Sequence, residues 1–279
     1  MDIKPASSPL PVVMTFAASD PTGGGGMQAD ILTLAALGTH PLSVLTGFTL
    51  QDTAGIEDVQ ASDGDWVVDQ ARVLLEDMRV QAFKVGVLVS IENVAAVAEV
   101  VSDYPDIPLV FDPVITTGRG DPLVDEEMLA AMSELLLPLT TVLTPNTMEL
   151  RRLAQEEDDG EEEAGGAETS LADCARHLIE LGAQHVLVTG AHEQTPQVVN
   201  TLHGARGTIR TDAWERLPGS YHGAGDTLAA AIAAFLAHGM PVPEAVQAAQ
   251  RYTWDTLAHG LRLGMGQMIP DRFYSIRQK

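Results

Sequence analysis

The sequence is short of several features that mark particular classes of protein. It has one cysteine in 279 residues, Cys174, so no disulfide can form within the chain and a reducing compartment is expected. It has no run of eighteen apolar residues, which argues against a membrane span, and its start, "MDIKPASSPLP", lacks the apolar segment of a signal peptide. These absences predict a cytoplasmic protein.

Basic residues are also scarce. The chain has 16 Lys and Arg residues against 39 Asp and Glu residues, which gives a formal net charge of -23. Nucleic acids and anionic membrane surfaces are bound mainly through clusters of Lys and Arg. The charge therefore argues against both as partners.

Short apolar runs alternate with helical segments along the chain. This pattern predicts an α/β protein with a parallel sheet covered by helices on both faces, folded as a single domain over residues 1–279. Two runs, 197–203 and 207–212, flank a short Gly-containing link and predict an antiparallel hairpin at a sheet edge. Strands are predicted at 12–18, 42–49, 82–88, 107–114 and 185–190. Helices are predicted at 27–37, 64–78, 91–104, 125–137 and 170–182, and again after Gly223. Residues 140–153 are predicted to form a strand, a Pro turn and a helix.

One segment differs in composition from the rest. Residues 155–168, "QEEDDGEEEAGGAE", hold eight acidic residues and no basic ones. Like charges at this density repel, and none of these side chains would pack in a core. We expect a mobile acidic insertion, which is either a solvated loop or a docking site for a basic partner.

Polar residues and glycines follow several of the predicted strands. Ligands of open α/β sheets bind beyond the carboxyl ends of the strands, so polar groups gathered there indicate a binding site. The glycine run Gly23–Gly26, Gln51, Asp112 and Asn146 all follow apolar strands. The glycines are either a simple turn or bare backbone that a ligand approaches, and Asp30 beyond them is either an exposed helix residue or part of the pocket.

A second glycine cluster precedes an Ala-rich helix. Gly223, Ala224 and Gly225 leave backbone N–H groups exposed at a helix N-terminus, where unpaired donors and the helix dipole favour anions. Asp226 in the first turn is either an N-cap or the base of a phosphoryl-transfer enzyme. His222, just before the cluster, is expected to have a structural or pocket-lining role and not a catalytic one, and the other histidines show no metal-ligand spacing.

Seven segments carry a resemblance to a known family, in consistent order from about Val12 to Gly260. They are "TFAASDPTGGGGMQADILTLAALG", "GFTLQDTAGI", "KVGVL", "FDPV", "GDPLVDEE", "LLLPLTTVLTPNTMEL" and "HGAGDTLAAAIAA". The sequence resembles the hydroxymethylpyrimidine and phosphomethylpyrimidine kinases of thiamine biosynthesis, in the ribokinase-like superfamily. The resemblance implies a three-layer α/β/α sandwich with a mostly parallel central sheet and an antiparallel edge hairpin.

The resemblance also implies an activity. It is the ATP-dependent phosphorylation of the hydroxymethyl group of 4-amino-5-hydroxymethyl-2-methylpyrimidine, and then of its monophosphate, by a homodimer. Two alternatives stay open: a pyridoxine or pyridoxal kinase, and a non-catalytic ligand sensor on the same fold. Gln51 favours the aminopyrimidine, because its amide both donates and accepts hydrogen bonds, whereas Asp226 favours the pyridoxine kinases.

Roles for individual residues follow from the same resemblance. It implies that the substrate is bound by Gly24, Asp30, Gln51 and Val87, the nucleotide by Asn146, Thr189 and Gly190, and Mg²⁺ by Asp112 and Glu149. The implied catalytic group is Gly223, Ala224, Gly225 and Asp226.

The chain departs from the family pattern in four places. Asp226 stands where the family's phosphomethylpyrimidine kinases typically have Cys. Asp52 replaces the Asn of the family's "Q-N-T" motif, and the acidic insertion is not part of the family pattern. Thr189 replaces the lysine of a "K-G-G-H" motif, and a hydroxyl does not supply the lysine's charge. We expect the missing lysine to affect the second phosphorylation more than the first.

Overall fold

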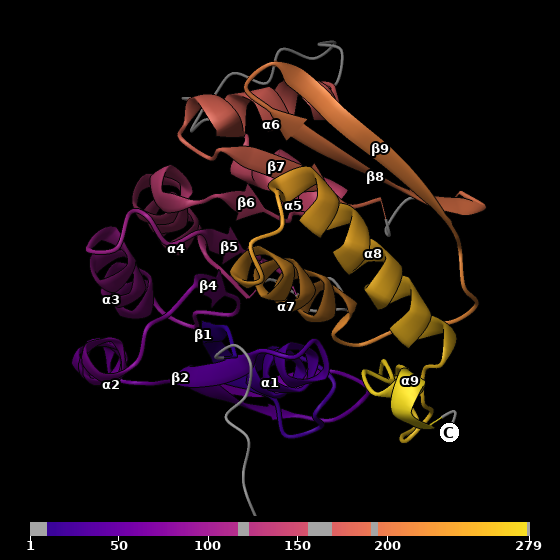
Figure 1. Ribbon diagram of the computed structural model, residues 1–279, viewed down its shortest axis with the longest axis horizontal. Coiled ribbons are helices and arrows are strands. Elements are labelled where there is room, and N and C mark those ends of the chain that lie inside the picture. The colour runs from indigo at the N-terminus through magenta and orange to yellow at the C-terminus, as the bar shows by residue number, and fades with distance from the viewer. Residues whose placement is uncertain (1–9, 117–122, 156–168, 191–194, 278–279) are drawn as a thin grey trace, which may run out of the picture.

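A single sheet organises the computed structural model, which describes residues 10–116, 123–155, 169–190 and 195–277. Within these residues the sheet has nine strands in the order β3-β2-β1-β4-β5-β6-β7-β8-β9 (Figure 1). The strands are β1 (Val12–Ser19), β2 (His40–Gln51), β3 (Ile56–Ala61), β4 (Ala82–Val85), β5 (Leu109–Phe111), β6 (Val142–Leu143), β7 (His185–Val188), β8 (Gln197–Gly204) and β9 (Gly207–Glu215).

The sheet is parallel in its middle and antiparallel at both edges. β2, β1, β4, β5, β6 and β7 pair in parallel, whereas β7, β8 and β9 pair antiparallel, which confirms the predicted edge hairpin. β3 pairs antiparallel with β2 at the other edge and was not predicted. Its sequence, "IEDVQA", is almost entirely exposed, so it lacks the apolar pattern that marks a strand.

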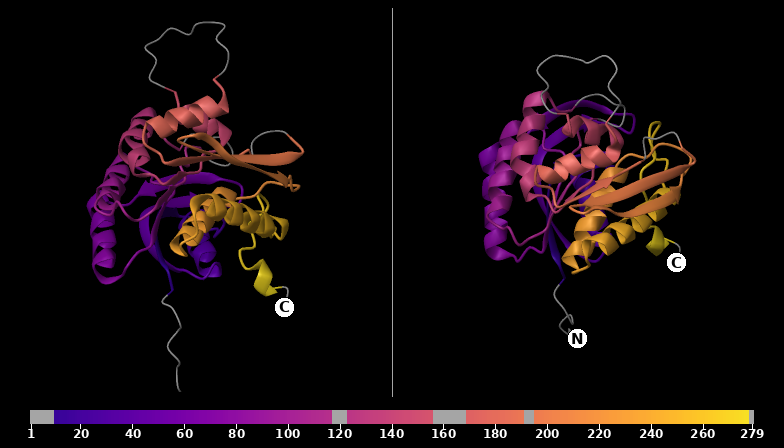
Figure 2. Two further views of the ribbon diagram at one scale, coloured as in Figure 1. Left: turned by 45° about the horizontal axis from the view of Figure 1, so that its top comes forward. Right: turned by 90° about the horizontal axis from the view of Figure 1, so that it is seen from above.

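Helices cover both faces of the sheet, as Figures 1 and 2 show, so the predicted three-layer arrangement is confirmed. One apolar cluster joins the sheet to α2, α3, α4, α5 and α6, and a second joins the opposite face to α1, α7 and α8. The helices are α1 (Gly26–Ala36), α2 (Gly64–Asp77), α3 (Ile91–Ser102), α4 (Glu126–Ala131), α5 (Thr147–Leu153), α6 (Leu171–Glu180), α7 (Ala224–Ala237), α8 (Val242–Ala258) and α9 (Tyr274–Arg277).

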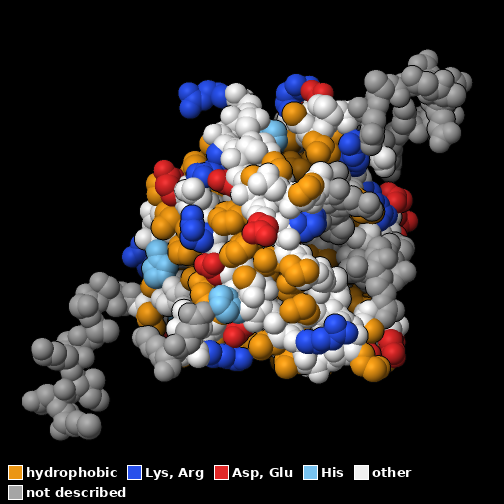
Figure 3. All heavy atoms as spheres, turned by 90° about the vertical axis from the view of Figure 1, so that its right-hand side faces the viewer, with side chains coloured by type: hydrophobic (Ala, Val, Ile, Leu, Met, Phe, Trp, Pro, Cys, Tyr) orange, Lys and Arg blue, Asp and Glu red, His pale blue; other side chains and the backbone are white. Residues whose placement is uncertain are grey.

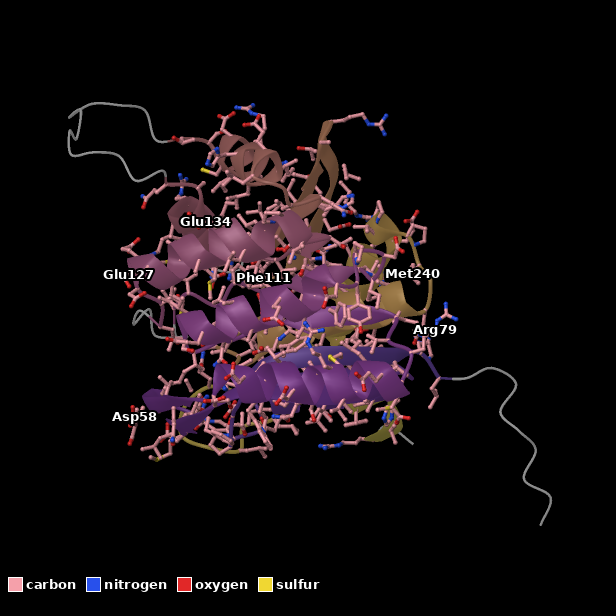
Figure 4. All side chains as sticks on the ribbon, turned by 90° about the vertical axis from the view of Figure 1, so that its left-hand side faces the viewer. Asp58, Arg79, Phe111, Glu127, Glu134 and Met240 are labelled. Atoms are coloured by element: carbon pink, nitrogen blue, oxygen red, sulfur yellow. The ribbon has the colours of Figure 1, made fainter. Side chains whose placement is uncertain are left out.

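The core lies between the sheet and the helices. Phe111 on β5 is fully buried at the centre of the molecule, whereas the labelled acidic side chains Asp58, Glu127 and Glu134 point outward (Figure 4). Burying one such aromatic or aliphatic side chain contributes about 1.5–3 kcal/mol. On α7 the run Ala229–Ala234 is fully buried, and its five alanines, interrupted only by Ile232, let the helix approach the sheet closely.

Two predicted helical regions differ from the structure. The helix expected at 125–137 is α4 followed by a π-helical turn, Met132–Leu136, and a 3₁₀ turn, Leu137–Leu139. Pro138 has no backbone N–H and clashes with the preceding turn, so a regular helix does not continue through it. Helix after Gly223 was also wrong for residues 259–273, where glycines and Pro270 favour an irregular chain.

The surface agrees with a chain that has no membrane span among its described residues. No described helix is long and apolar enough to cross a bilayer. Figure 3 shows one side of the molecule, on which acidic, basic and apolar side chains are interspersed. Of the acidic insertion only Gln155 lies within the described residues, so its predicted mobility stays a prediction. The organisation of residues 1–279 as a single domain also stays a prediction.

Candidate active site

A cleft with a volume of about 530 Å³ opens at the carboxyl ends of the parallel strands. This is the position that the sequence predicts for a ligand site. Of the residues proposed from the sequence, those that line the cleft are Gln51, Val87, Asp112, Asn146, Glu149, Thr189, Gly223, Ala224, Gly225 and Asp226. Gly24, Asp30 and Gly190 are not among the lining residues, although Gly26 of the glycine run is.

The glycine run is shaped by Asp20, three residues before its first glycine. Oδ2 of Asp20 accepts a hydrogen bond of 2.6 Å from the backbone N–H of Gly25, and Oδ1 accepts one of 2.8 Å from Thr22. A Cβ atom on Gly24 or Gly25 would lie 2.4 or 2.9 Å from the ring of His222. The bare backbone therefore makes room for a side chain of the protein itself, which the sequence did not reveal.

His222 connects this turn to the end of β2. Its Nε2 atom lies 2.6 Å from Oδ2 of Asp20 and 2.8 Å from Nε2 of Gln51. Burial opposes ionisation of Asp20, but the hydrogen bonds from His222 and Gly25 outweigh it and lower its pKa to about 2. Asp20 is therefore a carboxylate at neutral pH, and the expectation that His222 lines the pocket is confirmed.

Arg272 holds the same turn from the other end of the chain. Its buried guanidinium donates hydrogen bonds to the carbonyl oxygens of Gly24 at 2.6 Å, Gly23 at 3.2 Å and Gly223 at 3.4 Å, and to Oγ1 of Thr227 at 3.1 Å. It thereby ties the glycine turn to the start of α7. Burial lowers the pKa of this guanidinium, with Asp226 opposing the shift.

Lys84 lies below the cleft, on β4 in the middle of the sheet. Its side chain is fully buried, and its Nζ atom lies 2.9 Å from Oδ1 of Asp30 and 3.3 Å from Oδ1 of Asp226. Asp30 is itself fully buried, and its Oδ2 accepts a 2.5 Å hydrogen bond from Thr15. The alternative of an exposed Asp30 is wrong, and its enclosed carboxylate offers no surface to a ligand.

Asp226 faces the cleft from the first turn of α7. Its side chain is 13% exposed. The N-cap of α7 is Gly223, with φ at 82°, so the alternative reading of Asp226 as the N-cap is wrong. The predicted helix N-terminus with its small residues is present, and its first N–H groups have no helical partners.

Two buried carboxylates, Asp112 and Glu149, lie at another wall of the cleft. Oδ1 of Asp112 accepts a 3.0 Å hydrogen bond from Thr144, and Oε2 of Glu149 accepts one of 2.9 Å from the backbone of Asn146. Burial raises the pKa of Asp112 to about 7, and burial together with the charge of Asp112 raises that of Glu149 to about 8. Neighbouring buried carboxylates of this kind favour a bound cation.

The donor set fits Mg²⁺ better than a transition metal. Carboxylate oxygens are the ligands that Mg²⁺ prefers, and the ion is usually held by one or two carboxylates together with substrate phosphates and water. Within the described part of the chain, no cluster of three or more His, Cys, Asp or Glu side chains would hold a metal by itself. The pair therefore suits an ion that arrives with a phosphate ligand.

Comparison with known proteins identifies the family. The sequence profile described as phosphomethylpyrimidine kinase matches residues 20–271. The chain belongs to the phosphomethylpyrimidine kinase family. It is similar to the hydroxymethylpyrimidine/phosphomethylpyrimidine kinase of Mycobacterium bovis, with 39% identity over 269 residues and 95% of each chain covered.

Two solved structures support the fold of this phosphomethylpyrimidine kinase family member. The pyridoxal kinase of Staphylococcus aureus, in complex with AMP-PCP and pyridoxal, aligns with a TM-score of 0.83 and 28% identity, covering 97% of this chain and 96% of its own. The phosphomethylpyrimidine kinase of Clostridium difficile aligns with a TM-score of 0.74 and 28% identity, covering 88% and 99%. The ribokinase-like fold implied by the resemblance is thus confirmed.

Of the three residues that the resemblance implies for nucleotide binding, two line the cleft and one does not. Asn146 caps α5 with its side chain and pairs with Thr189 across neighbouring strand ends, and both line the cleft. Gly190 donates its N–H to Asn200 at 3.0 Å, and a Cβ atom there would lie 2.3 Å from the carbonyl oxygen of Val199. The close approach of β8 therefore explains why residue 190 is a glycine. Residues 191–194 lie outside the described residues.

Val87 is held rigidly at the end of β4. Its carbonyl oxygen accepts hydrogen bonds from the backbone of Ala18 at 3.1 Å and from Oγ1 of Thr46 at 2.6 Å. The next residues form a tight turn, in which Ser90 donates to Leu88 at 2.8 Å and Val89 has φ at 67°. A positive φ is rare for a β-branched residue and strained, so the surrounding hydrogen bonds must hold this turn in place.

Proposed function

We propose that the protein transfers the γ-phosphoryl group of ATP to the hydroxymethyl oxygen of 4-amino-5-hydroxymethyl-2-methylpyrimidine, and then to the resulting monophosphate. One observation carries the proposal: a carboxylate, Asp226, faces the cleft beside the open N–H groups at the start of α7. A base next to an anion site is the arrangement that phosphoryl transfer to a hydroxyl requires. The similarity to hydroxymethylpyrimidine/phosphomethylpyrimidine kinases supports the choice of substrate.

The chemical step uses Asp226 as general base. Its carboxylate accepts the proton of the hydroxymethyl group while the hydroxyl oxygen forms a bond to the γ-phosphorus of ATP. The bond from that phosphorus to the bridging oxygen breaks, and ADP leaves with the bonding electrons. The backbone N–H groups of residues 223–226, aided by the helix dipole, stabilise the charge on the transferring group.

Substrate and nucleotide bind on different walls of the cleft. We assign the pyrimidine to Gln51 and Val87, at the ends of β2 and β4. Gln51 recognises the aminopyrimidine edge through its amide. Asn146 and Thr189 contact the nucleotide. Because Thr189 replaces the family's lysine, the nucleotide phosphates lack that lysine's positive charge. We therefore expect the monophosphate to be a poorer substrate than the unphosphorylated aminopyrimidine.

Asp112 and Glu149 would hold Mg²⁺ and its waters. When bound, the ion neutralises phosphate charge during the transfer. The two carboxylates fit this role because their burial leaves their negative charge with little solvent to stabilise it.

A pyridoxal kinase is the rival reading, because the similarity to the Staphylococcus aureus enzyme extends over nearly the whole chain. An assay that couples ADP release to a colour change, run with the aminopyrimidine, its monophosphate, pyridoxine and pyridoxal, separates the two. We expect the highest kcat/KM for the aminopyrimidine. A higher value for pyridoxal would overturn the proposed substrate, and release of ADP with none of the four would favour a non-catalytic sensor. The homodimer and the cytoplasmic location stay predictions.

A further inference from the structure

Lys84 is a buried cation placed between two carboxylates from different helices. Asp30 lies on α1 and Asp226 on α7, and Lys84 reaches both from β4 without any exposed surface of its own. A Cβ atom on Gly86 would lie 2.5 Å from Nζ of Lys84. The ammonium group is therefore packed against the glycine two residues ahead of it, which leaves it little freedom to move.

We propose that Lys84 is a positioning residue that sets the orientation of the Asp226 carboxylate for proton transfer. The inference rests on the proposed function, in which Asp226 is the base. Lys84 holds Oδ1 of Asp226 at 3.3 Å, and within the described residues Oδ2 accepts no hydrogen bond. Oδ2 is thus the oxygen left to take the proton, and it lies 3.2 Å from the position of a Cβ atom on Gly25, beside the glycine turn.

The contact to Asp226 is additional to what Lys84 needs for its own burial. Asp30 already gives the ammonium a fully buried counter-charge at the shorter distance of 2.9 Å. Asp226, by contrast, is partly exposed and could turn toward water if nothing held it. The pairing therefore acts mainly on Asp226, and it fixes a side chain whose direction decides whether a base can act.

This role predicts a particular kinetic signature. Lys84 has no surface in the cleft, so its loss should leave the binding of substrate nearly unchanged. A misplacement of a reacting group by about 1 Å can cost about a hundredfold in rate. The effect should therefore appear in kcat and not in KM, and it should vanish when Asp226 is no longer a base.

The test removes the buried charges as a pair, because Lys84→Met alone would leave Asp30 as an uncompensated buried carboxylate. The double variant Lys84→Met/Asp30→Asn is compared with the parent, with Asp226→Asn, and with all three substitutions together. We expect the double variant to lower kcat about a hundredfold with KM for the aminopyrimidine within about threefold. In the Asp226→Asn background the same pair should change kcat by less than about threefold.

Two further variants keep the result interpretable. Lys84→Gln/Asp30→Asn preserves hydrogen bonding in a neutral core, and it replaces the Met variant if that one does not fold. Arg72→Met/Glu99→Gln removes two ion pairs of Arg72 on α2, to Glu99 on α3 at 2.8 Å and to Asp103 just after α3 at 2.9 Å, and should leave kcat unchanged.

The outcomes distinguish this inference from the proposed function. Losses that multiply in the triple variant, or a double variant with kcat within about threefold of the parent, would overturn the role of Lys84 alone. A parent-like rate for Asp226→Asn would overturn both. If pyridoxal is the better substrate, the same comparison made with pyridoxal tests Lys84 independently of the substrate assignment.

Discussion

The guanidinium of Arg272 donates a 2.6 Å hydrogen bond to the carbonyl oxygen of Gly24, 248 residues earlier in the chain. Through further bonds to Gly23 and Gly223, it joins the turn after the first strand to the helix that carries the proposed base. The glycine turn and the start of α7 therefore keep a fixed separation. This contact should matter for stability and catalysis together.

Replacing Arg272 with Met should destabilise the protein and weaken catalysis. The change leaves buried carbonyl oxygens without donors, at a cost of about 1–3 kcal/mol for each one that water does not reach. We expect a melting temperature several degrees lower and kcat/KM lowered at least about tenfold. Arg277→Met, which alters a mostly exposed arginine near the same end, is the control. Equal behaviour of the two variants would contradict the bridging role.

Asp226→Asn should lower kcat by about 10²–10⁴, the usual contribution of a general base. Asn keeps the size of the side chain, and the N-cap of α7 is Gly223, so the helix should be unaffected. Single-turnover phosphorylation with both substrates bound measures the step directly. A rate within about threefold of the parent would exclude Asp226 from the chemistry and direct attention to His222.

Gln51→Ala should weaken binding of the aminopyrimidine by roughly ten- to a hundredfold, because each unmet polar group costs about 1–3 kcal/mol. The affinity for ATP should barely change. Calorimetric titration of both ligands makes the comparison, and Gln60→Ala, on the exposed strand β3, is the matched control. Unchanged pyrimidine affinity would place the substrate pocket elsewhere.

The stability of the metal-free protein should fall as pH rises. Asp112 and Glu149 have folded pKa values of about 7 and about 8, above the ordinary values of 3.8 and 4.5. A group whose pKa is raised on folding contributes stability below its unfolded pKa, and that contribution is lost as pH rises through the folded pKa. The free energy of unfolding should therefore decrease between about pH 4 and pH 8.

Thermal melts in chelator, at about pH 6 and about pH 8.5, measure this decrease. Mg²⁺ should stabilise the protein more at the higher pH. There the two carboxylates are already ionised, so Mg²⁺ binds without first displacing their protons. Asp112→Asn should reduce both the pH dependence and the response to Mg²⁺. A pH dependence identical in parent and variant would contradict the origin assigned to it.

The sequence predicted those parts of the site that depend on local pattern. Asp112 and Asn146 follow apolar strands, and in a parallel sheet the ends of such strands meet at one edge, so their presence in one cleft was predictable. The small residues at the start of α7 likewise marked a helix N-terminus. The roles of these residues in binding and catalysis stay predictions.

The contacts that join distant segments were not predictable. Lys84 and Asp226 are 142 residues apart, and His222 fills the space beside glycines for which a simple turn and a ligand were the predicted alternatives. Periodicity reports only on neighbours within a few residues, and such pairings arise from how the strands are ordered. For Lys84 one signal was available: it is the single charged residue in the apolar run "AFKVGVL", and a buried charge requires a partner.

The bond between Arg272 and Gly24 also bears on when the protein can begin to work. During synthesis the glycine turn emerges early, and Arg272 is added 248 residues later. At roughly 5–20 residues per second this interval is on the order of 10–50 s. Most of the sheet can form in that time, but the turn and α7 are not yet tied together. The chain can therefore form most of its sheet before its cleft is complete, and the fixed cleft geometry becomes possible only once Arg272 has been added.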